Sequence, residues 1–441
     1  MSSNHPPANG LFATFCLSSY LLSLSYGTTF LLAMMLRAHG ASEADAGSVI
    51  SAAMLSTFLA VIISGHLTDL IGAPRAVAAG ALFLAAACLG FAAAPGFGTA
   101  MLLCGLLLGF GWGVFYTLGP IIVAMLIEPA RRVKYFALLS GSMMTGIGTG
   151  PLLGRAAQAL GYPVEAAFVA AAAASLLGGG LFLLIGPRLQ QLKTGAVAVC
   201  RITPAAARSV LSSKAAFAIL MVGLGGAIFG GLSSFQTSYA SARQLDYSLF
   251  FLGFMSAAIS CRLLIAGFIV KRDPYLMACL LTALMVLAVL MFMYGVDSAA
   301  AYVLAAVVLG VGYGLTYSVI NGLAANEAPT GQTAQSLVLF SLAYFVGVFG
   351  FPLLAGKVIV QAGMPALLQL LLLIALANWS ITVGRLLWRR WSNRPVMGGF
   401  ERAHYASALT GSMERRKARI VSLHTSWRAT CCHFAIRCRV W

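Results

Sequence analysis

The sequence predicts an all-α membrane protein whose twelve transmembrane helices form two pseudo-symmetric six-helix bundles. Three observations predict this fold class: long uncharged apolar stretches, basic residues gathered in alternate polar breaks, and an internal repeat. Apolar residues are 60% of the 441-residue chain, or about 265 residues, which is what twelve spans of roughly 22 residues need. Charged residues are only 9%, against roughly 25% in soluble domains. These proportions exclude an ordinary cytosolic enzyme, a disordered chain and a small disulfide-stapled secreted domain.

Uncharged stretches bounded by short polar breaks define the twelve predicted spans. Residues 76–127 carry no charge but are too long for one crossing, and the turn-forming sequence Pro-Gly-Phe-Gly at 95–98 divides them into two spans. The first apolar run follows no basic leader and is too long for a signal-peptide core, so we expect a retained span. The predicted spans cover residues 11–36, 47–68, 76–94, 99–127, 136–154, 164–186, 215–240, 248–270, 275–294, 299–323, 333–356 and 366–388.

The longest internal connector divides the chain into halves. It covers residues 187–214 and holds five basic and no acidic residues. If the N-terminus is cytoplasmic, the inside segments hold 22 Lys and Arg and the outside segments hold four, so the positive-inside rule predicts both termini in the cytoplasm. We expect a multi-pass protein of the plasma membrane (bacterial inner membrane). The predicted domains are a bundle over 1–186, the basic cytoplasmic linker over 187–214, a second bundle over 215–388 and a basic cytoplasmic tail over 389–441.

The basic excess of +17 does not predict nucleic-acid binding, because the Lys and Arg residues lie between apolar runs rather than in one solvated patch. The linker suits the anionic inner leaflet, or is a solvated connector with no specific partner. Nine cysteines follow no CxxC spacing, and those of the tail match no zinc pattern. We therefore expect no metal and no cofactor, and a monomer in the lipid bilayer.

The strongest signal is a repeat at an offset of 201 residues. Residues 151–153, Pro-Leu-Leu, recur at 352–354, and residues 28–30 resemble 233–235 at a slightly different offset. Parallel repeats of six helices place a binding site at their interface near mid-membrane, where rocking exposes it to either side. In the fourth and tenth predicted spans the matched residues are Gly109, Gly111, Trp112, Gly113, Tyr116 and Thr117 with Gly310, Gly312, Tyr313, Gly314, Tyr317 and Ser318.

Glycines at four-residue spacing form a second pattern. Such spacing clears one helix face, so that a neighbouring backbone can approach closely. Static packing explains any single glycine as well as a mechanical role does, but the recurrence in both halves favours a moving interface. The two runs in the first half are Gly105, Gly109 and Gly113, and Gly146, Gly150 and Gly154.

Residues 65–75, with the sequence GHLTDLIGAPR, resemble the loop signature between the second and third helices of the major facilitator superfamily. A short loop with a glycine at each bend, an Asp and an Arg can lock against a neighbouring helix end and then release. The resemblance implies a gating role for Gly65, Asp69, Gly72 and Arg75. It pairs Asp69 with Arg131, Arg132 or the start of the eleventh span. The second half keeps a degraded copy that begins at Arg262, with Lys271 in place of the Asp.

Residues 146–154, with the sequence GIGTGPLLG, are similar to the antiporter motif of the same family, GxxxGPxxGG, with Arg155 replacing the last glycine. The resemblance implies export and a gating role for Gly146, Gly150, Pro151 and Gly154, and a structural kink at the proline is the alternative. Where the family places an Arg four residues before the GxG of the fourth helix, this chain has Gly105. Proton coupling is therefore left open.

Charges inside the predicted spans are few. All eleven Asp and Glu fall at span ends, in loops or in the tail, so a proton relay would have to use Asp69, Glu165 or His66. Arg262 is the one clear intramembrane charge in this interpretation. We expect it to form a structural ion pair with a gating role, and substrate contact is the alternative.

The first, fourth, seventh and tenth spans are expected to line the cavity. Trp112 and Tyr116, like Tyr313 and Tyr317, are spaced i, i+4 and share a helix face. Aromatic faces with hydroxyls, an amide and no fixed charge suit a neutral or weakly cationic amphiphile. Helix packing or interfacial anchoring is the alternative for each aromatic residue. The predicted substrate-binding residues are Ser23, Tyr26, Trp112, Tyr116, Gln236, Tyr239, Tyr313, Tyr317 and Asn321.

The sequence thus predicts a secondary active transporter that works by alternating access and exports a small organic molecule, with protons as the candidate coupling ion. The alternatives are an uptake permease or uniporter for a small metabolite, and a non-transporting membrane sensor or scaffold with the same fold. An enzyme is not expected, because no carboxylate pair, His cluster or Ser-His-Asp set lies within the spans.

Overall fold

The structure is a computed structural model that describes residues 9–94, 96–126, 132–191, 203–264 and 272–392. Within these ranges the regular structure is helical and contains no strand. The chain divides into two compact units, Met1–Leu386 and Leu387–Trp441. The architecture that follows is that of the first unit, and the predicted tail after residue 392 lies outside the described residues.

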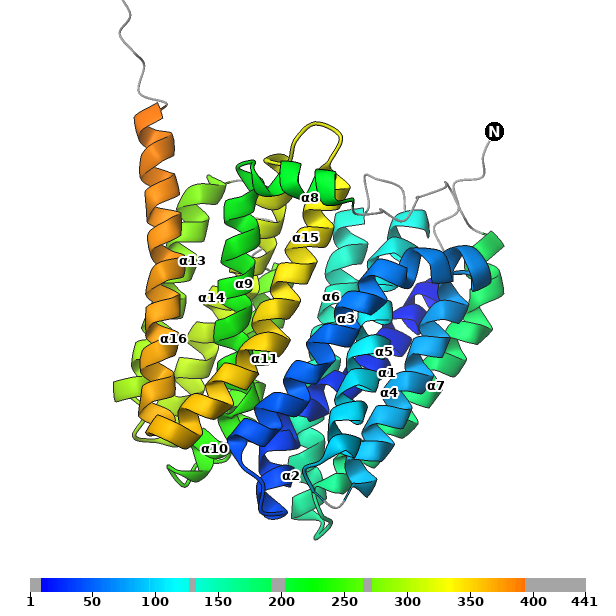
Figure 1. Cartoon of the computed structure of the whole chain (residues 1–441), viewed down its shortest axis with the longest axis vertical. Coiled ribbons are helices and arrows are strands. Elements are labelled where there is room, and N and C mark those ends of the chain that lie inside the picture. Colours follow the sequence, from blue (N-terminus) through cyan, green and yellow to red (C-terminus); the bar gives the residue numbers. More distant parts are fainter. Residues whose placement is uncertain (1–8, 95, 127–131, 192–202, 265–271, 393–441) are drawn as a thin grey trace, which may run out of the picture. The chain divides into compact units, whose positions relative to one another are not determined.

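The helices of the first half pack chiefly on one another (Figure 1). These helices are α1 (Asn9–Thr28), η1 (Thr29–Leu31), α2 (Leu32–Ala38), α3 (Glu43–Ile71), α4 (Ala73–Ala93), α5 (Thr99–Leu126), α6 (Arg132–Ala159) and α7 (Glu165–Gln191). Helix α1 packs against α6 and α7, α3 packs against α5, and α4 packs against both α5 and α7. α4 ends at Ala93 and α5 begins at Thr99, which confirms that two helices cover the long uncharged stretch.

The second half repeats this pattern of packing. Both α11 and α13 pack against α14, and α9 packs against α14, α15 and η3. The bounds are α8 (Pro204–Leu211), α9 (Ala215–Ser234), α10 (Gln236–Ser241), α11 (Ser248–Leu264), α13 (Pro274–Tyr294), α14 (Ala299–Asn326), α15 (Thr333–Phe345), η3 (Val346–Gly350) and α16 (Phe351–Ser392). The long α16 turns at Gly363, whose φ of 82° is left-handed and is followed by Pro365.

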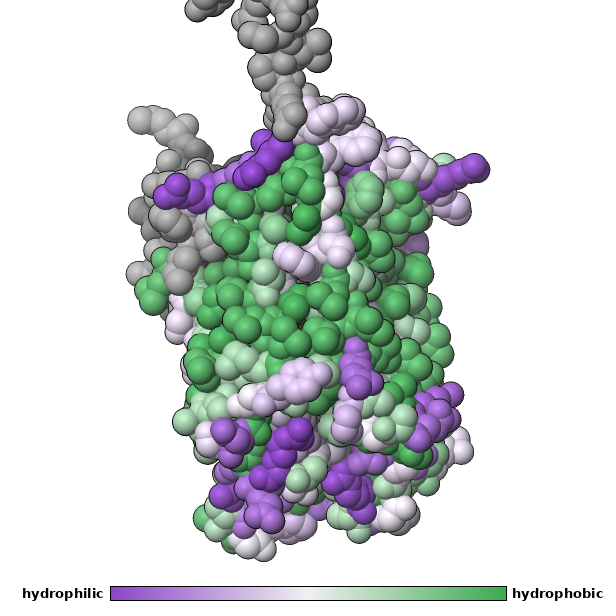
Figure 2. All heavy atoms as spheres, turned by 90° about the vertical axis from the view of Figure 1, so that its left-hand side faces the viewer, coloured by the Kyte–Doolittle hydropathy of each residue, from purple (hydrophilic) through white to green (hydrophobic). Residues whose placement is uncertain are grey.

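In the described part of the chain, nine helices are long and apolar enough to cross a membrane. Two predicted spans, 333–356 and 366–388, fall within a single candidate membrane helix, Thr333–Trp391. The turn at Gly363 divides this helix between the two predicted spans. The predicted spans that correspond to α6 and α11 are not among the nine. Figure 2 shows hydrophobic residues gathered in a band between two more polar ends. The chain is thus a multi-pass membrane protein, and the count of twelve spans stays a prediction.

The first helix of each half breaks at matching positions of the repeat. In the first half, α1 gives way to the short 3₁₀ turn η1 at Thr29. In the second half, α9 ends before Phe235, whose φ of −118° and ψ of 17° are not helical, and α10 follows. These are the segments 28–30 and 233–235 that resemble each other in sequence. The structure therefore repeats a helix break as well as a helix order.

The two ends of the bundle are called the Arg37 end and the α8 end. At the Arg37 end, α3 starts with a capping box, in which Ser42 Oγ accepts a hydrogen bond from the Asp45 N–H at 3.3 Å. The Asp45 carboxylate accepts the Ser42 N–H at 2.8 Å, so this acid caps a helix. At the α8 end, the described parts of the predicted linker are mostly helical, because α7 continues to Gln191 and α8 covers Pro204–Leu211.

Candidate functional site

Aromatic side chains from both halves meet in the interior. Tyr26 of α1 stacks on Trp112 of α5, with ring centroids 4.8 Å apart, and meets Phe349 of η3 edge-on at 5.4 Å. Tyr26 and Trp112 are both 2% exposed. Rings pack closely here because stacked and edge-to-face pairs both satisfy the charge distribution of the π-systems. We call this set the aromatic cluster: Tyr26, Trp112, Tyr116, Tyr313, Tyr317, Tyr344, Phe345 and Phe349.

The hydroxyl oxygens of Tyr116 and Tyr317 lie 2.7 Å apart, within hydrogen-bond distance. These two residues are counterparts in the repeat, separated by 201 positions. Two equivalent residues can touch only where the pseudo-twofold axis that relates the halves passes between them. The hydrogen bond therefore places the middle of the aromatic cluster on that axis, at the interface between the halves.

The second half contributes a third tyrosine that the sequence analysis did not select. The Tyr344 ring of α15 stacks on Tyr116 at 6.1 Å, and Tyr313 Oη donates to Tyr344 Oη at 3.3 Å. The predicted cavity residues came from four spans and not from the eleventh, so Tyr344 was not among them. Of the predicted substrate-binding residues, the structure brings together Tyr26, Trp112, Tyr116, Tyr313 and Tyr317.

Three other predicted substrate-binding residues, Ser23, Gln236 and Tyr239, have different surroundings. Gln236 accepts a hydrogen bond from Tyr302 at 2.7 Å, and the Tyr239 hydroxyl donates to the Phe292 carbonyl at 2.7 Å, so both pack within the second half. Ser23 donates to the Ser19 carbonyl at 2.7 Å and faces α6. Asn321 lies one helical turn from Tyr317 on α14 and is partly buried, and its side chain hydrogen-bonds to Tyr317, so it joins the predicted residues at the aromatic cluster.

Arg262 approaches the aromatic cluster from α11. Its side chain is 8% exposed, and its guanidinium carbon lies 5.7 Å from the centroid of the Tyr317 ring. Its Nε donates to the Gly314 carbonyl at 3.1 Å, and its Nη1 donates to Ser140 Oγ of α6 at 2.7 Å. Both partners are neutral. The expected carboxylate partner is not found among the residues that the structure describes.

The gating signature at 65–75 is more helical than the sequence suggests. Gly65 lies inside α3 and makes no bend, because the helix continues to Ile71. Gly72 is the only bend, with a φ of 82° that favours glycine, and Arg75 already belongs to α4. Asp69 is exposed in the last turn of α3. Its predicted partner Arg131 lies outside the described residues, as does the side chain of Arg132.

The second glycine run of the first half contacts α1. A Cβ added at Gly146 would meet the Tyr20 carbonyl, one at Gly150 would meet the backbone of Gly27 and Thr28, and one at Gly154 would meet Leu31. The close backbone approach that the spacing predicts is therefore present between α6 and α1. Pro151 follows within the same helix, next to the break between α1 and η1.

Charged residues join the two halves at the Arg37 end. Arg37 binds both Glu43 and Ser238, and Arg155 Nε donates to Asp246 Oδ2 at 2.7 Å. Burial raises the pKa of the Asp246 carboxyl, but hydrogen bonds from Ser248 and Arg155 outweigh burial, so the pKa lies below its ordinary value. The sequence offered only a weak signal for these pairs, namely opposite charges at predicted outside ends.

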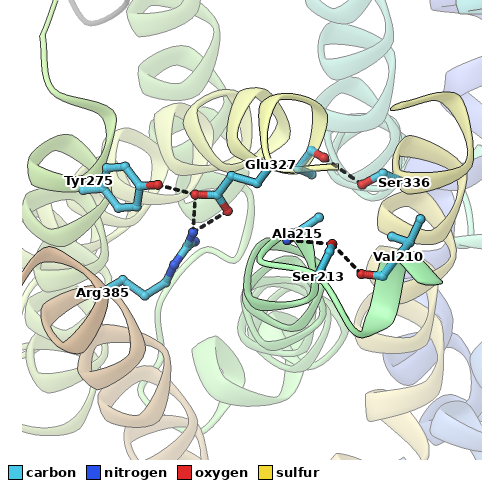
Figure 3. Close-up of polar contacts among 8 residues, drawn as sticks. Val210, Ser213, Ala215, Tyr275, Glu327, Ser336 and Arg385 are labelled. Carbon is cyan, nitrogen blue, oxygen red and sulfur yellow. Dashed lines mark hydrogen bonds and ion pairs between the residues drawn. The ribbon is translucent and has the colours of Figure 1, made fainter. Parts of the chain in front are cut away.

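A buried ion pair ties together the helices of the second half at the α8 end. Arg385 of α16 forms a hydrogen-bonded pair with Glu327, the residue after α14, and the Tyr275 hydroxyl of α13 donates to the same carboxylate (Figure 3). The side chains of Arg385 and Glu327 are 11% and 9% exposed. Arg385 was not predicted as a buried charge, because it lies three residues before the end of its predicted span.

These features define a class: a multi-pass helical membrane protein with two related halves and a buried aromatic cluster on the axis between them. The model of the Major Facilitator Superfamily matches residues 11–352. The chain belongs to this family of transporters. Membership confirms the coarse prediction of a membrane transporter.

Solved structures of transporters share this fold. They include the human organic anion transporter MFSD10 (TETRAN), with a TM-score of 0.61 and 16% identity over 85% of this chain and 100% of that one. The peptide transporter POT in complex with sulfate has a TM-score of 0.68 and 18% identity over 86% and 95%. The nucleoside transporter NupG has a TM-score of 0.64 and 16% identity over 86% of this chain and 99% of that one. None of the curated proteins compared with the chain matches it.

Proposed function

We propose that the chain is a secondary active transporter that moves a small organic molecule across the plasma membrane by alternating access, in the direction of export. The hydrogen bond between Tyr116 and Tyr317 is the single observation that carries this proposal. It joins equivalent residues of two repeats, so the aromatic cluster lies where rocking of the halves would open it to one side and then the other. Similar structures transport organic anions, peptides and nucleosides by name, all of which are small organic solutes.

The contacts between the halves support a conformation that is closed at the Arg37 end. Besides the two charged contacts there, Ser51 Oγ of α3 donates to the Phe349 carbonyl at 2.7 Å, and the backbones of Gly47 and Pro352 lie against each other. Gly47 and Ser51 lie near the start of α3 at the Arg37 end, and Phe349 lies in η3, near the middle of the helical stretch between Thr333 and the turn at Gly363. With the α8 end in the cytoplasm, as the basic residues predict, the Arg37 end is the outer end of the protein.

Twelve spans in two bundles, cytoplasmic termini and a monomeric state belong to the same proposal. A proton-coupled mechanism would need a titratable group, and the aromatic cluster contains no carboxylate among the described residues. This composition favours a second candidate, a uniporter or uptake permease for a small metabolite, in which the solute moves down its own gradient.

Transport by the purified protein in proteoliposomes tests the proposal. We expect at least one solute from a panel of drugs, sugars, nucleosides, peptides and organic acids to cross with saturable kinetics. The Tyr116→Ala variant should reduce that flux, whereas Tyr294→Ala, an exposed position at 79%, should not. A folded protein that moves no solute, with or without a pH gradient, would overturn the proposal and favour a sensor or scaffold.

Direction and gating need separate measurements. Cells with and without the protein distinguish export from uptake by the amount of solute that they retain. The Asp69→Asn variant should reduce flux if residues 65–75 form a gate, as the family resemblance implies. Unchanged flux in that variant would remove Asp69 from the gate and leave the transport proposal intact.

A further inference from the structure

We propose that Arg262 binds the anionic group of the substrate, so that the transported solutes are small aromatic carboxylates. This inference rests on the proposed transport function and names the substrate class of the same site. It replaces the expectation, drawn from the sequence, of a neutral or weakly cationic solute. The observation behind it is a buried positive charge beside the aromatic cluster with no negative partner among the described residues.

Among the described residues, no carboxylate pairs with the charge of Arg262. A buried guanidinium in a membrane span is energetically unfavourable unless a carboxylate neutralises it. The Gly314 carbonyl and the Ser140 hydroxyl satisfy two N–H groups, but they carry no charge. Arg385, also buried in the second half, pairs with Glu327. If Arg262 had a purely structural role, we would expect it to form an ion pair as Arg385 does. A substrate-binding role instead leaves its charge available to a ligand.

The guanidinium has donors left for a ligand. Arginine carries five N–H groups in a planar fork, and the Gly314 and Ser140 hydrogen bonds use two of them. Carboxylates fit this fork with two parallel hydrogen bonds, which are stronger than neutral ones. The Tyr317 ring lies beside the guanidinium at 5.7 Å, and its hydroxyl faces Tyr116. When the halves move apart at the aromatic cluster, an aromatic carboxylate can place its charge on Arg262 and its ring among these tyrosines.

The contact with Ser140 links this binding to the movement of the halves. Arg262 belongs to α11 and Ser140 to α6, so their hydrogen bond at 2.7 Å crosses between the halves. A carboxylate that draws the guanidinium toward the aromatic cluster competes with Ser140 for the same donors. Because the ligand then favours conformations in which this bond is absent, binding shifts the balance between conformations.

Binding to paired ligands tests the inference on the full-length purified protein. The probes are benzoate, 4-hydroxybenzoate and phenylacetate, each compared with its neutral amide of the same size, and the readout is the ligand-dependent shift of the thermal midpoint. We expect at least one carboxylate to bind about tenfold more tightly than its amide. We expect Arg262→Gln to remove this preference by weakening carboxylate binding about tenfold or more. Arg262→Lys should retain part of it.

Two controls keep the outcome decisive. Lys357→Gln removes an exposed positive charge and should leave binding unchanged. Ser140→Ala keeps Arg262 and frees one of its donors, so it should bind the carboxylate at least as well as the wild type, even if Arg262→Gln folds poorly. Equal binding of acid and amide, no binding by any carboxylate, or weakened binding in Ser140→Ala would overturn the inference. Saturable transport of neutral solutes that ignores Arg262→Gln would overturn it while leaving the transport function standing.

Discussion

At the scale of single residues, the interface between the halves depends on hydroxyl groups that are buried away from water. The sequence predicted Trp112, Tyr116, Tyr313 and Tyr317 as one set, because i, i+4 spacing and the repeat both select them. The structure joins them through ring contacts and the hydroxyl pair. Gln236 and Tyr239 were placed in the same set, but the break at Phe235 changes the face that the following residues present, and they contact Tyr302 and Phe292 instead.

Removing one hydroxyl of the central pair should leave the other without its partner. We expect Tyr116→Phe and Tyr317→Phe each to lower the free energy of unfolding by about 1 kcal/mol. The double variant should cost less than the sum of the two, because both remove the same hydrogen bond. Unfolding in detergent, followed by tryptophan fluorescence, measures all three. The control combines Tyr116→Phe with the exposed Tyr294→Phe, whose effects should add. Additive effects of Tyr116→Phe and Tyr317→Phe would show that the two hydroxyls do not interact.

At the scale of helices, the sequence predicted most of the order and much less of the irregularity. The apolar runs and the turn at 95–98 located helices along the chain. The predicted spans were mostly shorter than the helices, since polar residues such as those before Ile71 and Gln191 continue the same helix. The short 3₁₀ and π turns at η1 and η3 depend on tertiary contacts, and hydropathy does not report those.

The contact between α1 and α6 should tolerate no side chain at Gly150. We expect Gly150→Ala to destabilise the protein by about 1–3 kcal/mol, since the new Cβ would overlap the backbone of Gly27 and Thr28. Gly141→Ala is the matched control on the same helix, where a Cβ meets nothing within 4 Å. It should be neutral or slightly stabilising. Thermal midpoints and the monodisperse fraction in detergent compare the two, and equal values would contradict the close approach.

The buried pair of Glu327 and Arg385 gives a second test at this scale. Glu327→Gln leaves the Arg385 charge buried and unpaired, which should cost about 3–5 kcal/mol. Replacing both, as Glu327→Gln with Arg385→Met, should recover most of that loss because no isolated charge remains. The measurement is again the unfolding free energy in detergent. Lys357→Met, which removes an exposed charge, serves as the control and should change the unfolding free energy little. A double variant no more stable than Glu327→Gln would refute the buried ion pair.

At the scale of the whole molecule, charged contacts at the Arg37 end hold the halves together. The sequence located these charges at one end but could not pair them, since Arg155 and Asp246 are 91 residues apart and lie in different halves. Pairing depends on how the two halves dock, and no local pattern encodes that. The same limit applies to Arg262, whose neighbours Ser140 and Gly314 come from separate helices.

Acid should weaken closure at the Arg37 end. The pKa of Asp246 lies below its ordinary value when the carboxylate is paired. The pair therefore stabilises the closed state fully at a pH above the ordinary pKa of the carboxyl group. This stabilisation is lost as the pH falls through the lowered pKa. Spin labels at Ala38 and Ser241, in a background without native cysteines, should report longer distances in strong acid. Asp246→Asn should lengthen them at neutral pH, and Arg155→Asp with Asp246→Arg should restore the short distance.

The contact between Tyr116 and Tyr317 has one more consequence. Because the repeats are parallel, the axis between them runs along the membrane normal, and a contact on that axis belongs equally to both halves. Substitution of either tyrosine should therefore disturb the two halves to the same extent. Substitutions of off-axis partners such as Arg155 and Asp246 should act at the Arg37 end alone.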